Sequence, residues 1–343
     1  MQYEVTIGIP VFRAVDYIEK TLESALCQTF PSIEFLVLDD CGGDGSIELV
    51  KRMQSEHPRG KDIRIVYNEK NLGVGVSRNH IIDEARGNFL YFLDSDDIIE
   101  PDSINKLVSV IYKYNADVVY GSWKRVDKVN DSPPLDYIYP FQELLAPDSL
   151  AMYAFKNYSS FRISVCNCLF DLSFLRTEQM KFTDSAFWED LAFTYELVTK
   201  VRRAVLLPDI TYHYLCRPGS LSHYQDREKL QKKEILNNAQ IIKFLKDKCC
   251  SLTKKTYLPY MCYNLEMNSF YIVCHILKHK HRIIPEFSSI EMHNILRYPT
   301  SLISIMHFRH KFFHNLFFWL ISYMPASVSL FFVLLLGKYK KVI

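Results

Sequence analysis

The sequence lacks the features of several common protein classes. Its net charge is only +2 over 343 residues, so nothing in the charge balance indicates nucleic acid as a partner. No G-x-G-x-x-G motif lies between the first predicted strand and the first predicted helix, which excludes a dinucleotide-dependent oxidoreductase. Internal repeats and low-complexity tracts are also absent. With 48% hydrophobic and 23% charged residues, the composition is that of a globular protein with room for one sizeable domain and a second part.

The cysteines do not indicate a zinc site. The nine cysteines have no repeating spacing, and neither Cys166-x-Cys168 nor the adjacent Cys249 and Cys250 fits the C-x₂-C pattern of zinc ligands. Such thiols are typical of the reducing cytosol. The chain begins a strand at Val5, without the basic and apolar regions of a secretion signal. We therefore expect reduced cysteines and a cytoplasmic location.

The strongest chemical signal is the stretch that starts at Phe89. Five apolar residues predict a strand buried on both faces, and Asp94, Ser95, Asp96 and Asp97 follow it. In an extended chain, residues two apart point the same way, so Asp94 and Asp96 could reach one site. Unpaired carboxylates are costly to bury, and oxygen ligands suit Mg²⁺ or Mn²⁺. We predict a divalent metal site here; the alternative is a solvated acidic turn that caps the next helix.

Strand-like and helix-like segments alternate over the first 123 residues. Strands are predicted at residues 4–9, 33–38, 63–67, 89–93 and 117–122, and helices at 17–28, 46–56, 76–86 and 101–114. This alternation predicts an α/β fold with a mostly parallel, doubly wound sheet. In such a sheet, ligands bind beyond the carboxyl ends of the strands. Asp39-Asp40 and Asp94-Ser95-Asp96 both follow predicted strands, so we expect them in one crevice.

The pattern is less regular after residue 123. An exposed loop is predicted at 124–140, strands at 165–170, 204–207 and 210–215, and helices at 148–155 and 188–200. From residue 226 the chain is predicted to be helical, with long periodic segments at 226–248 and 253–280. The predicted organisation is an α/β domain at residues 1–225 and a mostly α-helical region at 226–343.

Residues 307–341 form an apolar, aromatic-rich tail with cations at both ends. The apolar run approaches the ~20 residues that span a bilayer, but Pro325 and the serines at 322, 327 and 329 interrupt it. Two short amphipathic helices that lie in the membrane interface fit better, since the flanking cations favour anionic lipid. We expect peripheral attachment to the inner face of the cytoplasmic membrane. A membrane span, and a helix packed within the protein or a homodimer, are the alternatives.

Short motifs follow one another in a specific order along the α/β domain. They are Thr6 to Phe12, Thr21 to Thr29, Phe35 to Asp40, Asn71 to Gly73, Ser77 to Asn79, Phe92 to Asp97, Trp188 to Asp190, Tyr212 to Tyr214, Arg217 and Gly219 to Ser222. In this order they resemble the motifs of inverting nucleotide-sugar transferases of glycosyltransferase family 2. The resemblance covers about residues 4–225. It implies the GT-A fold, a Rossmann-like sheet with flanking helices.

The resemblance also implies a binding site for a UDP-sugar. Its candidate residues are Pro10, Val11, Phe12, Asp40, Arg78, Asp94 and Ser95. The end of the first strand would cradle uracil, and Asp40 would accept a hydrogen bond from the ring N–H. Arg78 would pair with the diphosphate, which suits the bidentate fork of a guanidinium, and Asp94 would bind the ribose. A helix cap at Asp40 and a solvated charge at Arg78 are the structural alternatives.

The metal and the base are assigned from the same resemblance. Asp96, the last Asp of the D-x-D motif, would hold Mn²⁺ or Mg²⁺ against the two phosphates. His213 could add a metal contact, although a buried structural histidine explains it equally well. Asp190 is the candidate general base for the acceptor hydroxyl, because it opens a predicted helix whose dipole favours an ionised carboxylate. Glu189 is the rival base or orients the acceptor; for both, ordinary helix N-terminal charge is the alternative.

The expected reaction moves a sugar from a UDP-sugar to a hydroxyl of a glycan or lipid-linked glycan. Residues 1–123 would bind the donor and residues 124–225 the acceptor, in the synthesis of capsule, exopolysaccharide or lipopolysaccharide. One motif departs from the family pattern. Many members carry Trp-x-Lys-Leu where this chain has Cys166-Asn167-Cys168-Leu169. A cation is therefore missing near the acceptor or phosphate region, and Arg162 is the candidate substitute.

Two other functions are weighed against this one. A polyprenyl-phosphate sugar transferase shares the N-terminal motifs, and the apolar tail keeps this alternative open. A non-catalytic module that binds nucleotide sugars or glycans would be expected to have lost part of the acidic set, whereas Asp40, Asp94, Asp96 and Asp190 are all present. The transferred sugar, the acceptor and the linkage position cannot be assigned from the residues.

Overall fold

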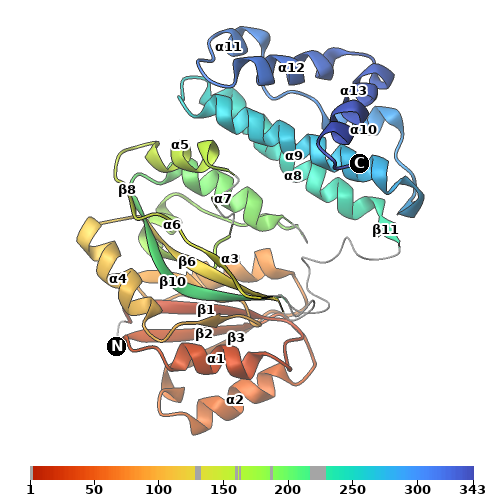
Figure 1. The fold of residues 1–343 in the computed structure, drawn as a ribbon. Coiled ribbons are helices and arrows are strands. Elements are labelled where there is room, and N and C mark those ends of the chain that lie inside the picture. The colour runs from red at the N-terminus through yellow and green to blue at the C-terminus, as the bar shows by residue number, and fades with distance from the viewer. Residues whose placement is uncertain (1–2, 128–132, 159–160, 162–163, 186–187, 217–228) are drawn as a thin grey trace. The chain divides into compact units, whose positions relative to one another are not determined.

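The computed structural model describes residues 3–127, 133–158, 161, 164–185, 188–216 and 229–343 (Figure 1). The chain forms two compact units. The first comprises residues 1–150 and 163–220, and the second comprises residues 151–162 and 221–343. Each unit has buried hydrophobic side chains of its own.

A ten-stranded sheet forms the centre of the first unit (Figure 1). In spatial order its strands are β3 (Ile63–Tyr67), β2 (Ile33–Asp39), β1 (Val5–Val11), β4 (Phe89–Phe92), β9 (Cys168–Asp171), β6 (Val118–Asp127), β10 (Ala204–Cys216) and β5 (Ile98–Ile99), with β7 (Leu135–Tyr137) beside β6 and β8 (Gln142–Leu144) beside β10. β3, β2, β1 and β4 are parallel, and β10 is parallel to β6. The antiparallel strand β9 joins these two groups. The predicted mostly parallel α/β sheet is therefore confirmed.

Helices of the first unit occur where the periodicity predicts them. They are α1 (Ile18–Leu26), α2 (Ser46–Glu56), α3 (Val74–Glu84), α4 (Ser103–Tyr114) and α7 (Glu189–Lys200), together with the short α6 (Leu172–Thr177), which was not predicted. α1 buries Ile18, Leu22, Ala25 and Leu26, the face that helical spacing predicts. β1 is buried along its whole length, as a strand is when helices cover both faces of a sheet.

The predicted loop at 124–140 is partly wrong. β6 continues to Asp127, and β7 pairs with it in antiparallel orientation. The rings of Trp123 and Tyr137 stack across this pair with centroids 3.9 Å apart, and such cross-strand aromatic pairs stabilise a ladder. The polar composition of this segment gave no sign of the strand pair, to which the stacked rings contribute.

Two other strand predictions also differ from the structure. The strands predicted at 204–207 and 210–215 are one strand, β10, whose register shifts between Leu206 and Ile210. Pro208 and Asp209 lie at this irregularity, and proline within a strand is confined to edges and bulges. The sequence therefore indicated a break where the strand only bulges. β9 begins at Cys168, later than the predicted strand at 165–170.

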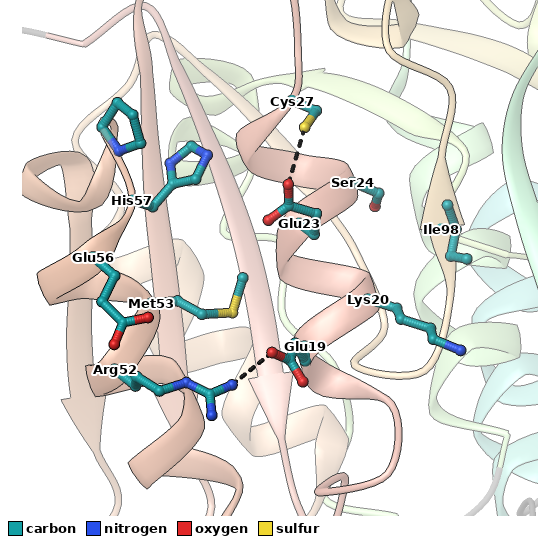
Figure 2. Close-up of a pocket in the computed structure, with 11 residues that line it drawn as sticks. Glu19, Lys20, Glu23, Ser24, Cys27, Arg52, Met53, Glu56, His57 and Ile98 are labelled. Atoms are coloured by element: carbon teal, nitrogen blue, oxygen red, sulfur yellow. Dashed lines mark hydrogen bonds and ion pairs between the residues drawn. The ribbon is translucent and has the colours of Figure 1, made fainter.

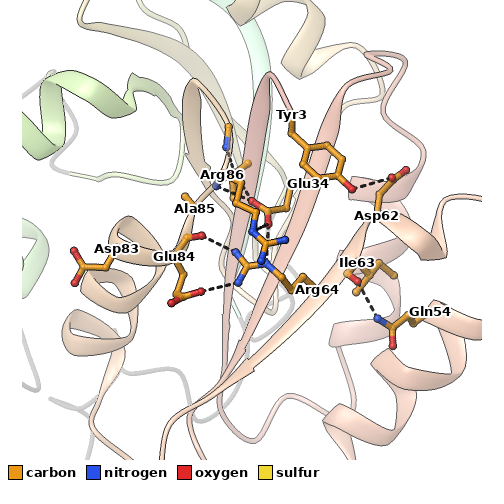
Figure 3. Close-up of polar contacts among 12 residues, drawn as sticks. Tyr3, Glu34, Gln54, Asp62, Ile63, Arg64, Asp83, Glu84, Ala85 and Arg86 are labelled. Carbon is orange, nitrogen blue, oxygen red and sulfur yellow. Dashed lines mark hydrogen bonds and ion pairs between the residues drawn. The ribbon is translucent and has the colours of Figure 1, made fainter. Parts of the chain in front are cut away.

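A buried polar cluster holds the amino ends of β1, β2 and β3 together (Figure 3). Glu34 is 1% exposed and accepts hydrogen bonds from Thr6 Oγ1 (2.7 Å), Arg64 Nε (2.8 Å) and the N–H of Arg86 (2.9 Å). Arg64 also binds the carboxylate of Glu84 at 2.7 Å. A carboxylate this deeply buried requires such partners. Because the cluster lies at the amino ends of parallel strands, away from their carboxyl ends, we assign it a structural role.

The second unit is mostly helical. It contains most of α5 (Ser149–Lys156), α8 (Lys232–Lys248), α9 (Leu258–Lys278), α10 (Ser289–Ile295), α11 (Leu302–Met306), α12 (Phe312–Tyr323) and α13 (Ala326–Tyr339), with β11 (Leu230–Gln231) and β12 (Ile283–Ile284) as a small parallel pair. The helical character agrees with the prediction, and the β11–β12 pair was not predicted. The tail forms α12 and α13, which are separated at Met324 and Pro325. Within the described part of the chain, no helix is long and apolar enough to cross a membrane.

Candidate active site

The carboxyl ends of the parallel strands gather several candidate residues. Pro10 and Val11 end β1, Phe12 follows it, Asp40 follows β2, and Asp94 comes shortly after β4. In a parallel sheet, these ends lie along one edge. Phe12 is 42% exposed, and the guanidinium carbon of Arg13 lies 5.2 Å from the centre of its ring. The end of β1 therefore carries a partly exposed aromatic ring, and its contact with uracil stays a prediction.

Asp40 is buried and organises the loop before α3. Its Oδ1 accepts hydrogen bonds from Asn68 Nδ2 (2.8 Å) and the N–H of Leu72 (2.8 Å), and its Oδ2 accepts one from the N–H of Gly73 (2.9 Å). Gly73 has a φ of +84°, a conformation that favours glycine. A carboxylate offers about four acceptor positions, and these contacts use three of them. The N–H of a nucleobase would bind at the remaining acceptor position. The contact of Asp40 with the base stays a prediction.

The acidic segment after β4 is a tight turn. The N–H of Asp97 donates to the carbonyl of Asp94 at 3.1 Å, as in a β-turn. The prediction that Asp94 and Asp96 point the same way along an extended backbone is therefore wrong. Asp94, Ser95 and Asp96 are half-buried, whereas Asp97 is 1% exposed. Burial, and then the charges of Asp96 and Asp94, raises the pKa of Asp97 well above its usual value.

Two contacts anchor this turn to β10. The carboxylate of Asp97 accepts hydrogen bonds from the hydroxyl of Tyr212 and the N–H of Leu215. His213 Nε2 lies 2.7 Å from a carboxylate oxygen of Glu100, so one ring nitrogen of this candidate metal ligand is already engaged. The remainder of the closing motif, Arg217 and Gly219 to Ser222, lies outside the described residues.

Arg78 joins the acidic turn to the start of α7. It is 3% exposed, and its Nη2 lies 2.8 Å from Asp94 Oδ1. Its Nη1 lies 2.6 Å from Asp190 Oδ1 and 3.0 Å from Glu189 Oε1. Burial lowers the pKa of Arg78, but the surrounding carboxylates, first Asp190 and then Asp94, raise it well above its usual value. The structure thus brings together residues from three motifs that are far apart in the sequence.

Aromatic packing holds Arg78 in place. Its guanidinium carbon lies 5.4 Å from the ring centre of Phe182, which stacks on Phe193 of α7 with centroids 4.0 Å apart. Asn79 exchanges two hydrogen bonds with the backbone of Phe182, one from its Nδ2 (2.9 Å) and one to its Oδ1 (2.7 Å). Asn79 therefore fixes the segment before α7, and that segment supports Arg78.

Glu189 and Asp190 open α7, as predicted. The side chain of Asp190 is 28% exposed, and that of Glu189 is 11% exposed. Burial, and then the negative charge of Asp190, raises the pKa of Glu189 to about 8. The greater exposure of Asp190 favours it as the base, a role that stays a prediction.

Cys166 also belongs to this cluster, although the sequence analysis did not place it in the site. Its thiol lies 3.2 Å from Asp94 Oδ2 and 3.8 Å from Arg78 Nη2. Burial, and then the charge of Asp94, raises the pKa of Cys166 well above its usual value, so the thiol donates to the carboxylate. The only signal in the sequence was the departure from Trp-x-Lys-Leu. Arg162, the candidate substitute for the lysine, lies outside the described residues.

The acidic turn fits a divalent cation that is shared with a substrate. Within the described residues, no group of three or more His, Cys, Asp or Glu side chains is arranged to hold a metal alone. Asp94 already binds Arg78 and Cys166, and Asp96 lies half-buried in the same turn. Mg²⁺ is usually held by one or two carboxylates together with substrate phosphates, and Asp96 suits such a site.

A surface hollow between α1 and α2 contains none of these residues (Figure 2). It has a volume of about 940 Å³ and is lined largely by charged side chains such as Glu23, Glu56 and Lys20. Glu19 and Arg52 pair with each other at its edge, 2.5 Å apart. Because the candidate catalytic residues lie elsewhere, we assign this hollow no part in the site.

Replacing Arg78 by Gln is expected to lower the free energy of unfolding by about 3–5 kcal/mol, because buried carboxylates would lose their counter-ion. Arg78→Lys keeps the charge without the fork, so we expect a smaller loss. Arg52→Gln is the matched control. Its exposed pair with Glu19 should contribute at most about 1 kcal/mol. Urea unfolding of the three variants checks this; equal losses in Arg78→Gln and Arg52→Gln would contradict it.

Together, the sheet, the acidic turn and the Arg78 cluster define an α/β protein with a carboxylate-rich site near the ends of its parallel strands. A model of the family described as "Glycosyl transferase family 2" matches residues 6–177, which is half of the chain. The chain belongs to this family and has the GT-A fold, followed by a helical C-terminal region.

Curated relatives are similar to between about two fifths and two thirds of the chain. Glycosyltransferase GlyA of Streptococcus pneumoniae is 28% identical over 233 residues, which cover 64% of this chain and 31% of GlyA. The putative teichuronic acid biosynthesis glycosyltransferase TuaG of Bacillus subtilis is 31% identical over 147 residues, 43% of this chain and 56% of TuaG. Succinoglycan biosynthesis protein ExoO of Rhizobium meliloti is 28% identical over 229 residues, 64% of this chain and 62% of ExoO. The chain thus spans from about a third to less than two thirds of these relatives.

Solved structures share the fold. The crystal structure of S. aureus TarS 1–349 in complex with UDP-GlcNAc superposes with a TM-score of 0.57 at 17% identity, covering 79% of this chain and 86% of that chain. The complex of TarS 1–349 with UDP gives 0.54 at 18% identity, covering 93% and 90%. At these identities the likeness shows the fold alone.

Proposed function

We propose that this chain is a metal-dependent, inverting glycosyltransferase that moves a sugar from a UDP-sugar to an acceptor hydroxyl. The observation that carries the proposal is the Arg78 cluster, in which the acidic turn after β4 and the Glu189-Asp190 pair meet on one guanidinium. A donor held at the turn would place its anomeric carbon near Asp190. The TarS complexes with UDP-GlcNAc and UDP support a uridine nucleotide as the donor carrier.

Asp190 acts as the general base in the proposed reaction. It takes the proton of the acceptor hydroxyl while the acceptor oxygen forms a bond to the anomeric carbon. The bond from that carbon to the β-phosphate oxygen breaks, and its electron pair leaves with UDP. Attack from the side opposite the leaving group inverts the configuration. Arg78 positions Asp190 through Oδ1, and Glu189, which shares the same guanidinium, is the candidate to orient the acceptor.

The acidic turn serves the donor. Asp96 would hold Mn²⁺ or Mg²⁺ together with the diphosphate, with Asp94 and Ser95 toward the ribose. When bound, the cation neutralises the negative charge that develops on the leaving diphosphate. Asp97 contributes by position, because its contacts with Tyr212 and Leu215 fix the turn against β10.

The acceptor is proposed to be a glycan or lipid-linked glycan of a surface polysaccharide. The names of TuaG and ExoO refer to teichuronic acid and succinoglycan biosynthesis, which supports this class. A lipid-linked acceptor would place the enzyme at the inner face of the cytoplasmic membrane. The runner-up is a polyprenyl-phosphate sugar transferase, which the apolar side chains of α12 and α13 favour.

A donor screen tests the proposal. The purified full chain is incubated with UDP-, GDP- and dTDP-sugars, Mn²⁺ and either glycan acceptors or polyprenyl phosphate, and nucleotide release is measured. We expect release from at least one UDP-sugar, dependent on a glycan acceptor and lost in chelator. Dependence on polyprenyl phosphate would select the runner-up. Tight UDP binding without release from any donor would identify a binding module instead.

A further inference from the structure

The outer faces of α11, α12 and α13 are unusually apolar. Large hydrophobic side chains on these helices are each more than half exposed, and we call this set the tail face: Ile303, Met306, Phe313, Tyr323, Phe331 and Leu335. A helix on the surface of a globular protein normally presents polar side chains to water. Exposed apolar surface on consecutive helices indicates an interaction site.

The opposite faces of the same helices are already committed to the core of the second unit. Asn315 of α12 is fully buried; it accepts a hydrogen bond from the hydroxyl of Tyr298 (2.8 Å) and donates one to the carbonyl of Pro259 (3.0 Å). The hydroxyl of Ser329 donates to the carbonyl of Ile321 at 2.7 Å, joining α13 to α12. These buried polar contacts fix the rotation of both helices about their axes. The side chains of the tail face therefore cannot turn toward this core unless these hydrogen bonds break.

The segment that carries the tail face has charged side chains of one sign. Between Met292 and the end of the chain there is no Asp or Glu, and the basic residues are Arg297, Arg309, Lys311, Lys338, Lys340 and Lys341. The whole chain carries a net charge of only +2, so this segment has a marked excess of positive charge. Lys338, Lys340 and Lys341, at the end of α13, are exposed. An apolar surface with cations at its border is the pattern of helices that lie in an anionic membrane interface.

We propose that the tail face binds anionic lipid bilayers, with Phe313, Phe331 and Leu335 among the acyl chains and the lysines at the end of α13 among the headgroups. α12 and α13 contain 12 and 14 residues, too short to span a bilayer, so the helices lie along its surface. A second copy of the chain fits less well, because a two-fold interface would place two segments with an excess of positive charge against each other. Binding of lipid does not depend on the proposed catalytic activity.

Vesicle flotation tests the proposal with the full chain. We expect the protein to float with vesicles that contain phosphatidylglycerol, to stay behind with phosphatidylcholine alone, and to be released by high salt. Lys338→Gln/Lys340→Gln/Lys341→Gln should weaken binding on the order of 100-fold, since each cation near an anionic surface contributes about a factor of five. Phe331→Ser/Leu335→Ser should weaken it at every salt concentration.

Ile138→Ser is the matched control, because Ile138 is 53% exposed in the first unit and should not affect flotation. Thermal unfolding by circular dichroism confirms that the variants fold, and light scattering without lipid reports the oligomeric state. Failure of the wild-type chain to float with phosphatidylglycerol vesicles overturns the proposal. So does a wild-type dimer that Phe331→Ser/Leu335→Ser converts to a monomer without any loss of lipid binding, since the tail face would then be a subunit interface.

Discussion

Asp190→Asn is expected to slow sugar transfer by about 10²–10⁴-fold, the usual contribution of a general base, and to leave UDP-sugar affinity nearly unchanged. The amide keeps the size of the carboxylate and can still approach Arg78, but it cannot take a proton. Asp190 is the more exposed member of the acidic pair, at 28% of its side chain, as a residue that meets the acceptor has to be. Steady-state kinetics with saturating donor give the turnover, and calorimetry gives the donor affinity.

Glu189→Gln is the internal control for this prediction. Burial, and then the charge of Asp190, raises the pKa of Glu189, and only 11% of its side chain is exposed, so we assign it an orienting role that glutamine can largely keep. We therefore expect a much smaller loss of turnover at pH 7. If Glu189→Gln is inactive while Asp190→Asn turns over normally, the base is Glu189. If neither variant is slowed, the pair only positions Arg78.

Asp96→Asn should nearly abolish metal-dependent turnover and weaken UDP binding in the presence of Mn²⁺. The reason is that Asp96, half-buried in the turn after β4, is the proposed ligand of a cation shared with the diphosphate. Loss of a metal-ligand oxygen removes charge stabilisation from the donor both before and during the reaction. Titration of Mn²⁺ against initial rate, for wild type and variant, measures the effect.

Two further variants serve as controls for Asp96→Asn. Asp83→Asn changes an exposed aspartate that pairs with Lys181, and it should leave metal dependence unaltered. Asp97→Asn changes a buried residue that anchors the turn to β10, and its main effect should be on stability. Full activity of the wild-type protein in excess chelator would show that Asp96 has no metal to hold.

Much of the first unit could be predicted because its signals are local. The apolar runs of β1 and β4 and the spacing of Ile18, Leu22 and Ala25 on α1 follow directly from burial and periodicity. β7 and the bulge in β10 could not, since they depend on the stacking of Trp123 on Tyr137 and on how a strand accommodates Pro208. These are tertiary effects that composition does not report.

The candidate site, too, could be predicted only in part. The resemblance assigned Asp94 to the donor and Asp190 to the acceptor hydroxyl, but nothing in their spacing indicated that Arg78 binds both. That contact depends on the packing of Phe182 on Phe193 and on the hydrogen bonds of Asn79. Likewise, the thiol of Cys166 reaches Asp94 through the placement of the segment before β9. The prediction that Arg78 meets a diphosphate stays open beside its observed carboxylate partners.

Calorimetric titration of UDP into wild type, Asp190→Asn and Asp96→Asn, each with Mn²⁺, tests the division of labour between the two aspartates most directly. We predict that wild type and Asp190→Asn bind UDP with affinities within about a factor of three, a difference of less than 1 kcal/mol, while Asp96→Asn binds at least about tenfold more weakly. The account is contradicted if wild type does not bind UDP, or if Asp190→Asn loses affinity as severely as Asp96→Asn does.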